Sequence, residues 1–215
     1  MAEDRDTVGR SEAYRILAAS FAPPDQPYFP DRGSFESLHH VMERICPAAA
    51  EASRIMRTEF DRCSLQELLV EHTRLFLGPF GVLAPPYGSV YLEDGGQLMG
   101  ETTVAVQSIY RESGLHIDET FREIPDHISA ELEFVYFLVH KELSARSRSD
   151  GNAAIEYLKK QEHFIERFLA EWSSEFVEKI KEHTRSGFYE ELGGCLQHFI
   201  PDDLRSLNTY LRTIS

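Results

Sequence analysis

The densest group of ionisable side chains in the sequence lies between Glu123 and Glu131 and includes Asp126 and His127. Pro125 suits the first turn of a helix, because the N–H that proline lacks would have no partner there. Asp126 would then lie at or beside the helix N-cap, where a carboxylate accepts free backbone N–H groups. His127 and Glu131 are four residues apart, so we expect them to share one face of this helix.

Three interpretations fit His127 and Glu131. They could bind a metal ion, but zinc and di-metal centres need at least three protein ligands, and no His-Glu-x-x-His spacing supplies another. A carboxylate beside an imidazole also favours the charged form of the ring, which would make His127 a pH-sensitive element. An ordinary helix start with a His–Glu pair on its face explains the same residues without any function.

No catalytic motif accompanies this group. The glycines at 95–96 lack the Lys and Ser/Thr of a phosphate-binding loop, and Ser89 lacks the second glycine of a nucleophile elbow. The three cysteines form no CxxC pair, which fits a reducing compartment better than a disulfide framework or a zinc site. We therefore expect a protein that is not an enzyme and needs no cofactor.

The charge of the chain points to a basic partner. With 22 Lys and Arg against 36 Asp and Glu, the net charge is −14, which disfavours nucleic acid and anionic membranes as partners. Ten acidic and two basic residues lie between Glu93 and Glu133, so more than half of the net charge is in this segment. The longest strongly apolar run, Phe134–Val139, is too short for a stable membrane insertion, and the acidic N-terminus shows no secretory signal. We expect a cytoplasmic protein.

A segment rich in glycine and proline, Gly78 to Gly100, adjoins the acidic stretch. It holds six Gly and three Pro, so a helix cannot form through most of it, yet it is too apolar for a solvated linker. We expect this irregular loop to pack onto the domain and to offer part of its surface to a partner, although a boundary between two domains is the alternative. Arginines of a cationic and apolar segment could pair with the carboxylates and stack on Tyr87 or Tyr91. A merely solvated acidic face is the alternative.

The elements that must position these residues are helices. Apolar residues recur at three- and four-residue spacing nearly everywhere, and strict alternation is almost absent. We expect residues 1–215 to form a single all-α domain of about nine helices. Ser64 stands three residues before Glu67, the spacing of a capping box. The longest stretch with apolar residues at this helical spacing extends from Ile155 to Ile180. Two further stretches of this kind, Phe188–Phe199 and Leu204–Ile214, close the chain.

Several stretches, taken in order, resemble the TorD/DmsD/NarJ family of redox-enzyme maturation chaperones. They are Glu71-His72-Thr73-Arg74-Leu75-Phe76-Leu77-Gly78-Pro79, then Pro86-Tyr87-Gly88-Ser89-Val90-Tyr91, then Glu123-Ile124-Pro125-Asp126-His127 with Glu131-Leu132-Glu133-Phe134. The resemblance implies a TorD-like helical fold and a cytoplasmic chaperone, which binds the twin-arginine signal peptide or the apo form of a molybdenum-cofactor oxidoreductase before export.

By the same resemblance, peptide binding is expected at Tyr87, Ser89, Tyr91, Glu123, Asp126, His127 and Glu131. Two positions depart from the family pattern: Val135 replaces the usual Met, and Gly88 stands where the loop usually has Glu. Two other functions stay open, namely an assembly factor for a non-exported nitrate-reductase-type enzyme and a metal-dependent helical enzyme using His127 and Glu131. We expect a monomer or a homodimer.

Overall fold

The computed structural model describes residues 2–78, 81–115 and 124–214. Within these residues the chain forms helices and no strand, which confirms the expected all-α fold. The α-helices are α1 (Ala2–Ser20), α2 (Arg32–Ile45), α3 (Pro47–Arg62), α4 (Leu65–His72), α5 (Gly88–Leu92), α6 (Glu101–Glu112), α7 (Ile128–Ser147), α8 (Gly151–Phe164), α9 (Ala170–His183) and α10 (Gly187–Ile214). Two π-helical segments are η1 (Thr73–Leu77) and η2 (Ile165–Leu169). Helix α4 continues into η1, and α8 continues through η2 into α9. The described residues therefore form nine separate helical rods, which agrees with the predicted number.

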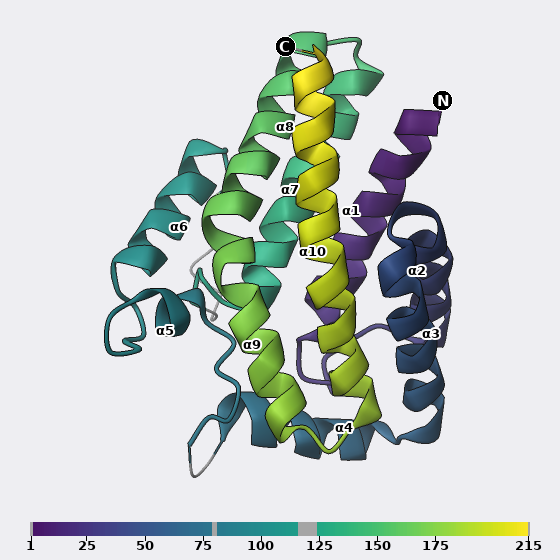
Figure 1. The fold of residues 1–215 in the computed structure, drawn as a ribbon, viewed down its shortest axis with the longest axis vertical. Coiled ribbons are helices and arrows are strands. Elements are labelled where there is room, and N and C mark those ends of the chain that lie inside the picture. Colours follow the sequence, from purple (N-terminus) through teal and green to yellow (C-terminus); the bar gives the residue numbers. More distant parts are fainter. Residues whose placement is uncertain (1, 79–80, 116–123, 215) are drawn as a thin grey trace.

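Most of the longer rods run roughly along the longest axis of the molecule, whereas α4 lies across one end of it (Figure 1). Helix α10 runs beside the rod formed by α8, η2 and α9, and it also packs against α3. Helix α1 packs against α7 and α2. Helices α5 and α6 lie at the edge opposite α2 and α3, where α5 contacts α9. The start of α1 and the end of α10 lie at the same end of the longest axis, away from α5 (Figure 1).

Local sequence signals explain where some helices begin. The capping box predicted at Ser64 is confirmed, because its hydroxyl accepts the Glu67 N–H at 3.2 Å and the Glu67 carboxylate accepts the Ser64 N–H at 2.8 Å. At the other end of the chain, the runs Phe188–Phe199 and Leu204–Ile214 belong to one continuous helix through Pro201. Proline removes one helical hydrogen bond, and Pro201 is exposed, so water can reach the carbonyl that lacks its partner.

One hydrophobic core connects the helices of the described chain. Its largest side chain is Trp172 on α9, which is fully buried. Aromatic rings link distant segments. The ring centroids of Tyr14 on α1 and Phe199 on α10 are 4.9 Å apart, and those of Phe76 on η1 and Phe176 on α9 are 6.0 Å apart. In the described residues, no helix is long and apolar enough to cross a membrane.

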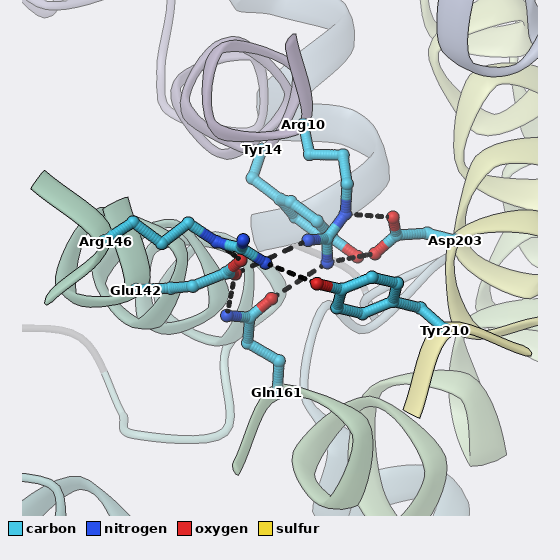
Figure 2. A network of polar contacts seen from close by, with 7 residues as sticks. All are labelled: Arg10, Tyr14, Glu142, Arg146, Gln161, Asp203 and Tyr210. Carbon is cyan, nitrogen blue, oxygen red and sulfur yellow. Dashed lines mark hydrogen bonds and ion pairs between the residues drawn. The ribbon is translucent and has the colours of Figure 1, made fainter. Parts of the chain in front are cut away.

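A buried polar network joins the first and last helices (Figure 2). Arg10 of α1 forms a two-bond ion pair with Asp203 of α10, which also accepts the Tyr14 hydroxyl at 2.8 Å. Arg10 further donates to Gln161 of α8 at 2.9 Å, and Gln161 donates to Glu142 of α7 at 2.8 Å. Figure 2 also shows Arg146, which donates to Glu142 at 2.8 Å and to the hydroxyl of Tyr210 at 3.4 Å. Each carboxylate oxygen of Asp203 and Glu142 thus has a hydrogen-bond donor, as a stable interior requires.

We predict that Asp203→Asn lowers the free energy of unfolding by about 3 kcal/mol, because the mostly buried Arg10 then loses its nearest counter-charge and keeps only the more distant Glu142. Urea unfolding at neutral pH measures the change. Glu12→Gln on the same α1 helix removes only the exposed Arg15–Glu12 pair and should cost less than about 1 kcal/mol. Equal losses in the two variants would contradict this role of the network.

Candidate functional site

The loop from 78 to 100 contains one helix that its glycine content did not suggest. Residues Gly88–Leu92 form α5, which packs between α6 and α9. Before α5, the backbone pairs in an antiparallel bridge at Tyr87 and His127. The N–H of Gly88 donates to the Asp126 carbonyl at 2.9 Å, and the N–H of Ile128 donates to the Pro86 carbonyl at 2.8 Å. This bridge brings together the two motifs from which the peptide-binding residues were predicted.

Asp126 holds this arrangement from inside and does not cap the helix that follows it. Its carboxylate is fully buried and accepts the Ser89 N–H at 2.7 Å and the Thr103 hydroxyl at 3.0 Å. Asp126 does lie beside the N-cap of α7, as predicted, because His127 occupies that position, but the expected contact of its carboxylate with this helix is wrong, and Pro125 precedes the first turn. Asp126 instead binds the first turn of α5 and the first turn of α6.

His127 is the N-cap of α7. Its Nδ1 accepts the Ser129 N–H at 3.2 Å, and the ring is almost fully buried. Burial, with a smaller contribution from nearby His72, lowers the pKa of His127 to about 3. The prediction of a charged imidazole supported by Glu131 is therefore wrong, because loss of hydration outweighs any nearby carboxylate.

Glu131 lies beneath α5 and is fully buried. One oxygen, Oε2, accepts the Trp172 indole N–H at 3.1 Å, while Oε1 has no hydrogen-bond partner. Burial raises the pKa of Glu131 well above its usual range, Trp172 opposes this shift, and the negative charge of Asp126 adds to it. This shift favours the neutral form of the carboxyl group in this conformation.

The absence of a side chain at Gly88 follows from the same contacts. A Cβ atom at Gly88 would lie 3.0 Å from Nε1 of Trp172 and 3.3 Å from Oε1 of Glu131. The ring of Tyr91 stacks on Trp172, with centroids 5.5 Å apart and planes 18° from parallel. Thus the departure of Gly88 from the family pattern lets α5 lie directly on the Glu131–Trp172 pair.

A small cavity opens beside the backbone bridge. Its volume is about 80 Å³, and it is lined by Tyr87, His127, His72, Glu133 and apolar side chains of α1 and η1. The rings of Tyr87 and His127 make an edge-to-face contact with centroids 5.1 Å apart. Of the predicted residues, only these two reach the cavity. Tyr91 is half-buried, and Ser89 is fully buried. Glu123 lies outside the described residues.

The exposed part of the region is the end of the loop and the start of α6. Here the apolar side chains of Leu92, Leu98, Met99 and Val104 are 37–69% exposed, and the carboxylates of Asp94 and Glu101 are exposed beside them in the sequence. We call these six residues the acidic–apolar surface. Their composition matches the expected preference for a ligand that is both cationic and apolar.

The sequence pattern missed three residues that build the site. Trp172 comes from α9, Thr103 from α6, and Gly88 had been noted only as a departure from the family pattern. No spacing relation links Trp172 to Glu131, because the two lie on different helices, 41 residues apart. A metal site also lacks support: the described residues contain no group of three His, Cys, Asp or Glu side chains placed so that they could hold a metal ion.

Known proteins share both the sequence and the fold of this chain. A model of the family described as nitrate reductase delta subunit matches residues 39–178, which include Tyr87, Asp126, His127, Glu131 and Trp172. The chain is 28% identical to the Tat proofreading chaperone DmsD of Salmonella typhimurium over 151 residues. This alignment covers 68% of the chain and spans only 65% of the length of that relative.

Two further relatives are matched over more of their length. The chain is 29% identical to the chaperone protein TorD of Vibrio parahaemolyticus, covering 73% of this chain and 72% of that protein. It is 26% identical to the perchlorate reductase assembly chaperone protein of Dechloromonas aromatica, covering 94% and 91%. A crystal structure described as a redox enzyme maturation protein from Archaeoglobus fulgidus superimposes on this chain with a TM-score of 0.55 and 22% sequence identity. The match covers 89% of this chain and 93% of that one, and it shows the same fold.

We predict that Glu131→Gln is more stable than the wild type by an amount that grows as the pH rises from about 4.5 to 8. The raised pKa means that the folded protein keeps a proton which the unfolded chain releases above about pH 4.3, so the native state loses stability as the pH rises. Thermal unfolding across this range measures the difference. The exposed Glu171→Gln on α9 should change stability by less than about 0.5 kcal/mol. A difference that shrinks with rising pH would contradict the neutral carboxyl.

The buried imidazole of His127 should make the native state less stable as the pH falls. Its lowered pKa means that the unfolded imidazole takes up a proton below about pH 6.5 while the folded one does not, so stability falls from pH 6.5 toward 3. We predict that His127→Asn, which keeps an oxygen able to cap Ser129, loses less thermal stability between pH 6.5 and 4. His198→Asn, an exposed change on α10, is the control. Parallel losses in all three proteins would argue against a neutral buried His127.

Proposed function

The chain belongs to the nitrate reductase delta subunit family, and from this premise we propose that it is a cytoplasmic chaperone for the maturation of a molybdenum-cofactor oxidoreductase. It would bind the twin-arginine signal peptide or the apo form of that enzyme until the cofactor is inserted, and it would do no chemistry of its own. The observation that carries the proposal is that the family match spans residues 39–178, which include Tyr87, Asp126 and Glu131, and that relatives named as chaperones align with most of the chain.

The surface around α5 supports a peptide of this kind. Carboxylates of the acidic–apolar surface can accept bidentate hydrogen bonds from arginine, and its exposed apolar side chains can cover the hydrophobic part of a signal peptide. Tyr87 and His127 line the adjoining cavity and can contact a side chain that enters it. Ser89, Asp126 and Glu131 are fully buried, so their direct contact with a peptide requires α5 to move, whereas Tyr91 is half-buried.

A second candidate is an assembly factor for a nitrate-reductase-type enzyme that is not exported, and the family description favours it. The two functions differ in the client, because an exported client carries a twin-arginine segment. Purifying the protein from its native host and identifying the oxidoreductase bound to it separates them. A client with a twin-arginine segment supports the export role, whereas a client without one supports the second function.

We predict that a synthetic peptide with adjacent arginines followed by an apolar segment binds to the protein, and that its Lys-Lys counterpart binds more weakly. Lysine cannot form the two parallel hydrogen bonds that arginine makes with a carboxylate. Isothermal calorimetry measures both affinities. Equal binding of the two peptides, or no binding of either, would contradict recognition of a twin-arginine segment.

The location of binding is tested by a matched pair of variants. Asp94→Asn combined with Glu101→Gln should weaken the Arg-Arg peptide by about five- to tenfold, since each partly exposed ion pair contributes up to about 1 kcal/mol. Glu156→Gln combined with Glu166→Gln removes two exposed charges from the α8–η2 rod and should leave the affinity within about twofold. If both double variants weaken peptide binding alike, the affinity depends only on the net charge of the protein, and binding at the acidic–apolar surface is contradicted.

A further inference from the structure

The polar atoms beneath α5 are incompletely paired. Among the described residues, six buried side-chain N and O atoms lack a hydrogen-bond partner, and three of them lie on α5 or directly below it: Ser89 Oγ, Tyr91 OH and Glu131 Oε1. Leaving a buried polar group unpaired costs about 1–3 kcal/mol, so such groups are uncommon in native interiors. Both Ser89 and Glu131 are fully buried, and this cluster therefore calls for a partner that the closed conformation does not supply.

The two acidic side chains below α5 have no positively charged partner among the described residues. None of the ion pairs in the described part of the chain includes Glu131 or Asp126. Two titratable neighbours interact electrostatically with Glu131: Asp126, which precedes α7, raises the pKa of Glu131, and Glu131 raises the pKa of Tyr110 on α6. From α9 and α5 come the neutral side chains of Trp172 and Tyr91. A guanidinium group would supply a positive charge that none of the described residues supplies to this site.

Few bonds hold α5 in place over Glu131. It is only five residues long, and the main contacts of its first turn are the Gly88 N–H to the Asp126 carbonyl and the Ser89 N–H to the Asp126 carboxylate. If α5 lifts, the Asp126 carboxylate loses its Ser89 partner and Glu131 loses its cover. Two carboxylates would then become available together, which matches the two guanidinium groups of an Arg-Arg segment.

We propose that α5 is a lid over Asp126 and Glu131, which lifts when an arginine-containing segment binds so that both carboxylates pair with guanidinium groups. This inference rests on the proposed function and adds how its ligand reaches the buried residues. The closed lid explains why residues expected to bind peptide lie inside the protein. The hydrogen bonds that Asp126 loses on opening are replaced by guanidinium–carboxylate bonds, in which both partners are charged and two parallel bonds can form.

Trp172 gives a direct readout, because it is the only tryptophan in the chain and lies under Tyr91 and beside Gly88. Titration with the Arg-Arg peptide should shift its emission to longer wavelength as water reaches the indole. Amide hydrogen exchange at Gly88–Leu92 should become faster in the complex. Calorimetric binding with unchanged emission and unchanged exchange would overturn the lid while leaving the proposed function standing. No calorimetric binding at all would overturn both.

A wedge variant tests the same step from the opposite direction. Gly88→Ala places a methyl group against Trp172 and Glu131, which should destabilise the closed lid and raise the peptide affinity several-fold by increasing the open fraction. Gly151→Ala is the control, since a Cβ there meets nothing within 4 Å. A Gly88→Ala protein that folds normally by circular dichroism but binds more weakly would show that the closed α5 is itself the binding surface.

The role of Glu131 is tested in the wedge background. Adding Glu131→Gln to Gly88→Ala should remove most of the gain in affinity, because a neutral amide cannot pair with guanidinium as a carboxylate does. The emission of Trp172 in the free double variant reports whether the lid is still displaced. If the double variant binds as tightly as Gly88→Ala with the lid displaced, Glu131 is not the guanidinium partner and the inference fails.

Discussion

The arrangement of the site depends on one buried carboxylate. Asp126 accepts a backbone N–H from α5 and a hydroxyl from α6, and its own carbonyl completes the backbone bridge that aligns the loop with the start of α7. A buried ion is tolerated only when its oxygens are paired, so these three segments must meet at this residue. The position of the small cavity, the stacking on Trp172 and the cover over Glu131 all follow from that requirement.

Two of the buried polar clusters in the described chain differ in how completely their oxygens are paired. Around Arg10 and Asp203, every carboxylate oxygen has a donor, and the cluster joins helices from both ends of the chain. Around Glu131 the pairing is incomplete, with an unpaired carboxyl oxygen and two unpaired hydroxyls. Complete pairing is typical of a structural role, whereas incomplete pairing near a surface is where a binding partner can still contribute favourable interactions.

The fold could be predicted from local patterns, and the contacts of the site could not. Helical periodicity and the capping box at Ser64 depend on residues a few positions apart, so the sequence alone shows them. The motifs around Tyr87 and Asp126 were also correctly singled out. However, capping by Asp126 was assigned to the nearest helix in the sequence, while its partner Ser89 lies 37 residues away. The pKa of His127 was predicted in the wrong direction because burial, which outweighs a neighbouring charge, depends on tertiary packing.

The location of the chain ends has a practical consequence for work on this protein. The start of α1 and the end of α10 lie at one end of the longest axis, and α5 lies away from both (Figure 1). A fluorescent protein, an affinity handle or a surface tether attached at either end would therefore stand clear of the acidic–apolar surface. The molecule can thus be immobilised in a defined orientation, with α5 facing the solution, without any change to the residues that form the site.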